Sequence, residues 1–482
     1  MQKNLEIYKK IVTLDFKSPH LETMYISARK ISIISGLAFA LLVAQTALAQ
    51  TTTVEKTQAG FTFIRNGKPY YVKGVGGDVN LDKAVKIGAN SIRTWGIENA
   101  QTVLDEAEKR GLTVMLGLWL QHERHGFDYD DKEKVEKQLV FYKSIIDKYK
   151  NHPALLMWGI GNELDLMYTN PNCWNAVQDI AKYAHEVDKN HPTSTVTAGL
   201  DSLEVQHIKQ RAPDIDIYCV NTYGDIPSVP KNIERFGWSG AYMITEWGVN
   251  GYWESPNTAW SVSIEQTSTE KKQVFYDRYT NYIAPYGKCL GSYAFLWGEK
   301  QEYTETWFGL FSKDNKPTEP VDALEMVFLN KNPEQASPTV EAMLLNDKKA
   351  ADNIKIKAAS RNNSATITAK IATNMLESQP DVAQKLRYEW KILAESADKK
   401  SGGDAEEAAQ EVGGLIRGSR KKEIVFDAPT EAGAYRLFAT VYLNDKIAYA
   451  NIPFWVDKRT EADGQAGFVE FKKASINKQD ED

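Results

Sequence analysis

The sequence predicts a (β/α)8 barrel followed by an immunoglobulin-like β-sandwich. Eight apolar runs of strand length alternate with segments of helical periodicity over residues 71–328, which is the pattern of a parallel barrel. A segment with Pro333 and Pro338 ends this alternation, and the runs after it have the pattern of strands only. With 482 residues, the chain can form one barrel of about 250 residues and a smaller domain.

Each predicted element follows from its own pattern of apolar and turn residues. Two apolar arms flank a turn at residues 65–69, which predicts a hairpin leading into the first barrel strand. The predicted barrel strands are residues 71–74, 91–94, 113–118, 154–159, 195–199, 215–221, 241–245 and 290–296. The predicted helices between them include residues 101–110, 132–149, 176–188, 202–211 and 270–283. The predicted sandwich strands are residues 354–358, 365–371, 387–393, 423–427, 434–443 and 448–456.

These elements define the expected domains. Residues 50–330 are expected to form the barrel with its N-terminal hairpin, residues 331–340 a linker and residues 341–457 the sandwich. Residues 397–410 are charged and contain glycine, which predicts a solvated loop, and the polar residues 458–482 are predicted to be disordered. The sandwich lacks a catalytic constellation, so we expect it to act as a spacer or to pack on the barrel rather than to bind carbohydrate.

The first 49 residues contain the pattern of a cleaved secretory signal. Two basic residues precede an apolar core at residues 31–44, and small residues up to Ala49 form a cleavage site. We therefore expect translation from Met24, export to the periplasm or the extracellular space, and a mature chain that begins near Gln50. The apolar core is too short to cross a membrane.

Charge and cysteine content narrow the function classes. A net charge of −6 argues against a nucleic-acid partner, because such proteins neutralise phosphates with clustered lysine and arginine. The three cysteines Cys173, Cys219 and Cys289 are too few for a disulfide framework, although one disulfide remains an alternative, and we assign none to catalysis. We expect a monomer, no cofactor, and a neutral or weakly charged substrate.

Two predicted strands end in glutamate. One apolar run ends in Asn162 and Glu163, and another is followed by Glu246. Because the C-terminal ends of barrel strands meet at one face, we expect the two glutamates to lie together. Such a pair can hydrolyse a glycosidic bond when one carboxyl holds a proton at neutral pH and the other is ionised. The alternative is that each is a solvated loop glutamate.

At these residues the chain resembles the clan A glycoside hydrolases, particularly the TIM-barrel domain of glycoside hydrolase family 2. The resemblance implies that Glu163 ends the fourth strand as acid/base and that Glu246 ends the seventh as nucleophile. It also implies substrate-site roles for Asn162, Arg93, His122, Tyr223 and Trp297, with Trp297 as the floor beneath the sugar. Asn221 departs from the histidine of many clan members and is similar to the family 2 form.

Several of these residues have simpler interpretations that remain open. Arg93 could hold a carboxylate ionised or form a structural ion pair, and Tyr223 could be a core tyrosine. His122, with His125 as the second choice, lies in a segment whose spacing does not match a helical zinc motif, so we expect a polar substrate loop and no metal. Aromatic planes pack against sugar faces, and the further candidates for substrate binding are Trp95, Trp119 and Trp253.

The first strand departs most from the family 2 pattern. Gly76 and Gly77 stand where family 2 exo-enzymes carry asparagine and a segment with histidine, which predicts an open groove. We therefore expect an exported, retaining endo-β-glucanase that cleaves β-glucan or oligosaccharides by double displacement, with glycosyl transfer to another sugar as a second outcome. A barrel followed by an immunoglobulin-like domain resembles glycoside hydrolase family 158, which suggests β-1,3-glucan.

Two other functions remain as alternatives. One is an exo-acting β-glycosidase of family 2 type, such as a galactosidase, mannosidase or glucuronidase. The other is a catalytically silent glycan-binding protein that keeps the groove, although binding alone does not require both carboxylates.

Overall fold

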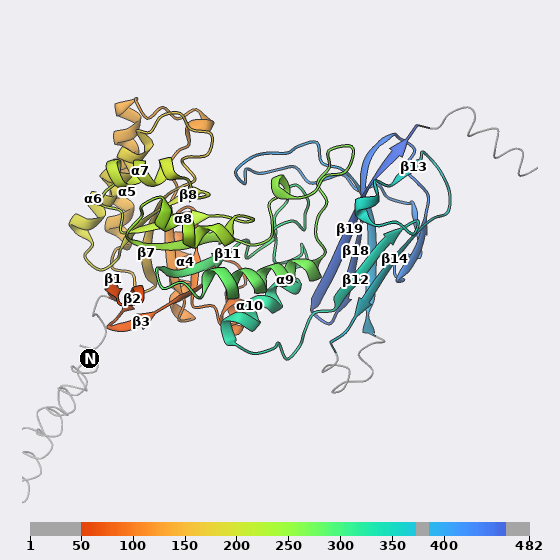
Figure 1. Ribbon diagram of the computed structural model, residues 1–482, viewed down its shortest axis with the longest axis horizontal. Helices are drawn as coiled ribbons and strands as arrows, with labels where there is room; N and C mark the ends of the chain where they lie inside the picture. Colours follow the sequence, from red (N-terminus) through yellow and green to blue (C-terminus); the bar gives the residue numbers. More distant parts are fainter. Residues whose placement is uncertain (1–49, 373–384, 459–482) are drawn as a thin grey trace, which may run out of the picture. The chain divides into compact units, whose positions relative to one another are not determined.

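A closed eight-stranded parallel barrel confirms the predicted fold class (Figure 1). The computed structural model describes residues 50–372 and 385–458, so the predicted signal region and most of the C-terminal tail lie outside the described residues. The strands are hydrogen-bonded in the order β10-β11-β4-β5-β6-β7-β8-β9. They are β4 (Val72–Gly76), β5 (Ser91–Arg93), β6 (Thr113–Leu118), β7 (Leu155–Asn162), β8 (Thr193–Ala198), β9 (Ile217–Asn221), β10 (Ala241–Trp247) and β11 (Cys289–Ala294).

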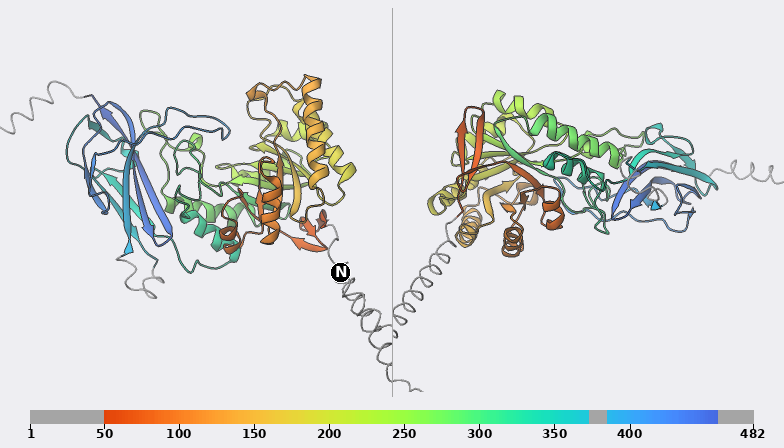
Figure 2. Two further views of the ribbon diagram at one scale, coloured as in Figure 1. Left: turned by 180° about the vertical axis from the view of Figure 1, so that it is seen from behind. Right: turned by 90° about the horizontal axis from the view of Figure 1, so that it is seen from below.

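Helices follow the barrel strands and surround the barrel, as the views in Figure 2 show. They are α3 (Leu81–Lys86), α4 (Ala100–Lys109), α5 (Lys132–Tyr149), α6 (Cys173–Val187), α7 (Ser202–Arg211), α8 (Val229–Arg235), α9 (Ser268–Arg278) and α10 (Glu319–Leu329). A π-helical turn, η4 (Tyr279–Ile283), extends α9, and 3-10 turns lie at η1 (Glu123–His125), η2 (Ile226–Ser228) and η3 (Tyr252–Glu254). Side-chain caps begin some of these helices: Asp131 accepts from the Lys134 backbone N–H, and Thr267 and Glu270 form a capping box.

The barrel interior is a packed apolar core. Met115, Met157 and Met243 lie in this core. The side chains that point inward from the parallel strands pack against one another and fill the barrel interior. A three-stranded sheet packs its fully buried Phe63 against this core. The sheet consists of β1 (Thr52–Thr57), β2 (Gly60–Arg65) and β3 (Lys68–Tyr70), so the predicted hairpin has a third strand, β1, that the sequence pattern did not reveal.

Two four-stranded sheets with an apolar core between them form the C-terminal sandwich. One sheet has the order β12-β14-β17-β16 and the other β13-β19-β18-β15. The strands are β12 (Thr339–Leu345), β13 (Lys355–Lys357), β14 (Asn363–Lys370), β15 (Arg387–Ala394), β16 (Ile416–Arg417), β17 (Glu423–Phe426), β18 (Gly433–Leu443) and β19 (Lys446–Asp457), and a 3-10 turn, η5 (Ala350–Asp352), precedes β13. β12 and β16 were not predicted, and β12 begins inside the expected linker.

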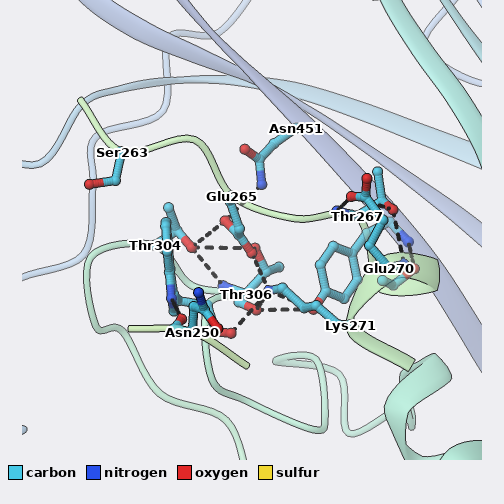
Figure 3. Close-up of polar contacts among 12 residues, drawn as sticks. Asn250, Ser263, Glu265, Thr267, Glu270, Lys271, Thr304, Thr306 and Asn451 are labelled. Carbon is cyan, nitrogen blue, oxygen red and sulfur yellow. Dashed lines mark hydrogen bonds and ion pairs between the residues drawn. The ribbon is translucent and has the colours of Figure 1, made fainter. Parts of the chain in front are cut away.

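A buried polar cluster joins the sandwich to the barrel (Figure 3). The Lys271 ammonium, whose side chain is 2% exposed, donates to Glu265 Oε1 at 2.6 Å and to Tyr449 Oη at 3.1 Å. Asn451 Nδ2 and Thr304 Oγ1 each donate to Glu265 Oε2 at 2.7 Å. Because Tyr449 and Asn451 belong to β19, the sandwich completes the surroundings of a buried ion pair and packs firmly on the barrel.

Two further observations bear on the expected setting of the protein. All three cysteines are buried and free, so the alternative of one disulfide is wrong. None of the helices in residues 50–372 and 385–458 is both long and apolar enough to cross a membrane.

Candidate active site

A cleft of about 750 Å³ opens at the C-terminal ends of the barrel strands. This is the face at which (β/α)8 barrels place their sites, and the volume lies within the roughly 300–1,000 Å³ that is common for small-ligand sites. Its lining includes Trp95, Trp119, Asn162, Glu163, Asn221, Tyr223, Glu246, Trp253, Phe295, Lys300 and Glu302. The two glutamates that end separate strands therefore lie in one cleft.

Glu246 lies on β10 and is held by three donors. Arg93 Nη1 and Trp95 Nε1 donate to Oε1 at 3.1 and 2.7 Å, and the Tyr223 hydroxyl donates to Oε2 at 3.0 Å. Burial raises the pKa of Tyr223 well above its ordinary value, so its hydroxyl keeps the proton that it donates. A buried carboxylate with a cationic partner and three donors is stabilised in its ionised form.

Glu163 follows β7 and has a different environment. Its backbone lies in the left-handed region with φ 51°, and its N–H donates to Val196 O on β8 at 2.9 Å. The side chain is only partly exposed, and Asn221 Nδ2 donates to its Oε1 at 2.8 Å. Desolvation and, after it, the negative charge of Glu246 together raise the pKa of Glu163 to about 8. At neutral pH this carboxyl holds a proton.

Arg93 connects the two glutamates through a shared network. Its Nη1 also donates to Asn221 Oδ1 at 3.1 Å, and its Nη2 donates to Asn162 Oδ1 at 2.5 Å. Asn221 therefore accepts from the arginine that binds the nucleophile candidate and donates to the acid candidate. We had named Asn221 only as a departure from the clan pattern, and nothing local in the sequence indicates this double contact.

Aromatic side chains form much of the cleft wall. Trp95, Trp119 and Trp253 line it, and the Trp253 side chain is 58% exposed, so its face is available to a ligand. Phe295 lies between them and packs edge-on against Trp95 and Tyr223. These planes suit the apolar faces of sugar rings.

Three of the predicted substrate residues, Arg93, His122 and Trp297, do not line the cleft, and Arg93 acts on it only through the side chains that it binds. Trp297 is buried against Phe311, and its backbone N–H donates to Gly76 O, which turns the chain away after β11. Phe295, two residues earlier, is the aromatic of this strand end that faces the cleft. His122 lies behind Trp119, stacked on it at 4.7 Å, with a pKa lowered to about 4 by desolvation.

The rim of the cleft contains charged groups that we had not predicted. Lys300 Nζ donates to Glu302 Oε2 at 2.8 Å, and desolvation raises the pKa of Glu302. Ser401, Gly402 and Gly403 from the sandwich also line the cleft, so the predicted solvated loop at residues 397–410, none of which is fully buried, also reaches the candidate site. Contacts between segments so distant in sequence leave no local pattern.

A possible metal site lies elsewhere in the molecule. Asp105, Glu108 and His152 could hold an ion, but they lie on α4 and just before β7, away from the cleft. The cleft itself offers two carboxyl groups in different environments surrounded by aromatic planes, which is the arrangement of a glycoside-cleaving barrel.

Comparison with known proteins agrees with this class. Residues 62–236 match the family model described as glycosyl hydrolases family 2, TIM barrel domain. The match includes Glu163, Arg93 and Asn221 and ends before Glu246. The barrel is therefore of the clan A type and similar to that of glycoside hydrolase family 2.

Curated relatives point the same way at low identity. A Beta-glucuronidase from Paenibacillus borealis is 27% identical over 229 residues, covering 41% of this chain and 35% of the relative. The Beta-glucuronidase of Homo sapiens is 23% identical over 195 residues, covering 36% of this chain and 27% of the relative. The chain thus spans about a third or less of the length of these relatives.

Two solved structures match the chain at still lower identity. The Beta-glucuronidase of Lactobacillus rhamnosus gives a TM-score of 0.47 at 18% identity, covering 59% of this chain and 53% of that one. The beta-glucuronidase of Bacteroides uniformis gives 0.45 at 14% identity, covering 85% of this chain and 48% of that one. The family model and the curated relatives support a glycoside hydrolase of family 2 type. They give no support to our main prediction of an endo-β-glucanase, and the exo-acting alternative fits them better.

Proposed function

We propose that the protein is a retaining, exo-acting β-glycosidase that releases one neutral sugar from the end of a glycan or glycoside. The observation that carries the proposal is the unequal pair in the cleft. Glu163 is desolvated and protonated, whereas Glu246 accepts from Arg93, Trp95 and Tyr223. One acid and one ionised nucleophile are what double displacement requires.

In the first step Glu246 attacks the anomeric carbon, and the bond from that carbon to the leaving oxygen breaks. Glu163 gives its proton to the leaving oxygen, so the aglycone departs as a neutral alcohol. As Glu246 becomes an ester, its negative charge is lost, and the pKa of Glu163 falls because the charge of Glu246 had helped to raise it.

In the second step the ionised Glu163 takes a proton from a water molecule, which attacks the anomeric carbon and releases Glu246 as a carboxylate. A sugar hydroxyl can replace the water, in which case the glycosyl group is transferred. Two displacements at the same carbon retain its configuration.

A neutral sugar fits the charges of the cleft. Among its lining residues the carboxylates are Glu163, Asp225, Glu246, Glu254 and Glu302. Lys300 is the one cation among these lining residues, and it already donates to Glu302 and to the Gly403 carbonyl. A uronic acid would add a carboxylate among like charges, so we infer that this protein differs in substrate from the relatives named Beta-glucuronidase.

Hydrolysis of 4-nitrophenyl β-glucoside, β-galactoside, β-mannoside and β-glucuronide tests this function. We expect kcat/KM for one neutral glycoside to exceed that for the glucuronide at least about tenfold, a difference of about 1.4 kcal/mol. A preference for the glucuronide would refute the neutral-sugar assignment. Binding of glycans without turnover of any substrate would favour the silent glycan-binding alternative. Early release of mixed oligosaccharides from a β-glucan would refute exo action.

The export of the protein from the cytoplasm is part of the proposal. The apolar core at residues 31–44 and the small residues before Gln50 support export through a cleaved signal. Sequencing the N-terminus of the protein from the periplasm or the medium tests this, and a mature chain that still carries residues 24–49 would refute it.

A further inference from the structure

We propose that the sandwich loop, residues 397–410, is a wall of the substrate cleft that spans from the segments after β10 and β11 to those after β6 and β7 and so restricts the cleft to one terminal sugar. This inference rests on the proposed function, because it explains how a barrel with a short first loop can act as an exo-enzyme. The loop connects β15 and β16 of the sandwich, yet it gives Ser401, Gly402 and Gly403 to the cleft lining.

On one side the loop is fixed by a charged contact. Asp404 accepts from Arg124 Nη1 at 2.7 Å and from Arg124 Nη2 at 3.3 Å, and it lies 3.0 Å from His125 Nε2. The Arg124 side chain is 7% exposed and the Asp404 side chain 33% exposed, so this ion pair is partly shielded from water and from salt. Arg124 and His125, the barrel partners of Asp404, lie in the segment after β6.

On the other side the loop is fixed to the segments after β10 and β11. Lys300 Nζ donates to the Gly403 carbonyl at 2.7 Å, and the Tyr252 hydroxyl donates to the Lys400 carbonyl at 2.8 Å. The Tyr303 backbone N–H donates to Glu406 at 2.7 Å. Lys300 and Tyr252 themselves line the cleft, so the loop is joined directly to the cleft wall.

The order of the barrel strands shows what the loop spans. β4 and β5 lie between β11 and β6, and the loop is fixed after β11 and after β6. The connections that follow β4 and β5 are short, because α3 begins at Leu81 and α4 at Ala100. The loop therefore joins the segments after β10 and β11 to those after β6 and β7, and it encloses a cleft that the sequence had predicted to be an open groove.

Two glycines let the loop come this close. Gly402 and Gly403 have φ of 66° and 71°, a region that other residues rarely adopt. A Cβ on Gly402 would lie 2.6 Å from Leu166 Cδ2 and 2.9 Å from Arg124 Nη2, and one on Gly403 would lie 2.9 Å from Lys300 Nζ. The loop thus lies in direct contact with the barrel rim.

The test removes the wall and keeps the sandwich. Ala394 N–H donates to Gln410 O at 2.9 Å, so the two chains at the base of the loop are already paired. Replacing residues 396–408 with a two-residue Asn-Gly turn suits such a pair, since this dipeptide favours a tight hairpin. Asp404→Ala is a milder variant. Asp427→Ala is its control, because Asp427 pairs with Arg417 inside the sandwich.

Three probes separate the wall from the chemistry: 4-nitrophenyl β-glucoside, the β-1,3-linked 4-nitrophenyl glucotrioside, and the same trioside with a benzylidene group capping its non-reducing end. The wall predicts that the wild type binds the capped trioside weakly. The loop-shortened protein should bind it at least about tenfold more tightly by calorimetry, and Asp404→Ala should show a smaller gain in the same direction. The Asp427→Ala control should bind it as the wild type does.

Affinity and turnover together give a clear decision. Equal affinity of the wild type and the folded loop-shortened protein for the capped trioside would overturn the wall, whatever the turnover. Tight binding of the capped trioside by the wild type would overturn it as well. Absence of hydrolysis of these probes and of the β-galactoside and β-mannoside would refute the proposed function alone, because the affinity comparison does not depend on turnover. Cleavage of the capped trioside by the loop-shortened protein but not by the wild type would support both.

Discussion

Replacing Glu163 with glutamine should stabilise the protein at neutral pH while it removes activity. A glutamine has the shape of the protonated carboxyl and no ionisable group, and its amide oxygen can still accept from Asn221. At pH 7 the folded carboxyl holds a proton because its pKa is about 8, whereas the unfolded carboxyl is ionised because its ordinary pKa is 4.5. Holding this proton costs the folded state free energy.

The cost follows from the two pKa values. Each pH unit above the ordinary pKa is worth about 1.4 kcal/mol, so at pH 7 the folded state loses about 3 kcal/mol. The penalty is absent below pH 4.5, grows as the pH rises, and is complete near pH 8. Glu163→Gln removes it, so the variant should exceed the wild type in free energy of unfolding by up to about 3 kcal/mol at pH 7.

Urea unfolding at pH 7 and at pH 4 measures this difference. We expect the gain at pH 7 to be nearly lost at pH 4, where the wild-type carboxyl is protonated in both states. Glu133→Gln on the exposed face of α5 is the matched control and should stay within about 0.5 kcal/mol. No gain at pH 7, or the same gain at both pH values, would show that Glu163 is not desolvated in the way that we describe.

The other predictions concern the chemistry and the barrel–sandwich contact. Glu163→Ala should lose roughly 10²–10⁴-fold in rate on glycosides with poor leaving groups and far less on activated aryl glycosides, whereas Glu246→Ala should lose activity on both kinds of substrate. Equal losses of Glu163→Ala on the two kinds of substrate, or a product of inverted configuration in proton NMR, would show that the assigned roles are wrong. Asn221→Ala removes a hydrogen-bond donor to the ionised Glu163, so it should raise the pKa of Glu163 and move the alkaline fall of kcat/KM to higher pH. A fall at the wild-type pH would show that this hydrogen bond does not affect the pKa of Glu163. Glu265→Ala leaves the Lys271 ammonium buried without its ionic partner and should destabilise the protein by roughly 3–5 kcal/mol in urea unfolding, and a loss below about 1 kcal/mol would show that water reaches the cluster.

The barrel and the catalytic pair could be predicted because their signals are local. Most barrel strands are rich in apolar residues, although β8 is rich in threonine, and parallel strands all end at one face, so glutamates that end two of these strands must lie near the same opening. Periodicity gave the long helices for the same reason, and α5 has the predicted bounds Lys132–Tyr149. The short α3 and α8 carry too few turns for a periodic signal to stand out.

What could not be predicted depends on contacts between distant segments. Trp297 and Phe295 are equally aromatic in sequence, and only the fold shows that Phe295 lines the cleft while Trp297 packs against Phe311. Asn221 was noted for a residue type and not for its bond to Glu163, because that bond joins two strands 58 positions apart. The loop at residues 397–410 has the composition of a solvated segment. Its contact with the cleft could not be predicted, because Asp404 binds a barrel residue about 280 positions away.

The sandwich loop and the pKa of Glu163 are physically linked. Desolvation is the larger cause of the raised pKa, and the loop contributes to it because Gly402 lies against Leu166, three residues after the acid. Shortening the loop admits water to this side of the cleft, which favours the ionised carboxyl and lowers the pKa of Glu163. The alkaline fall of kcat/KM should therefore move to lower pH in the loop-shortened protein and stay in place in Asp427→Ala. If the fall kept its wild-type position while the capped trioside bound more tightly, the loop would act on substrate length alone, and the desolvation of Glu163 would come from the barrel.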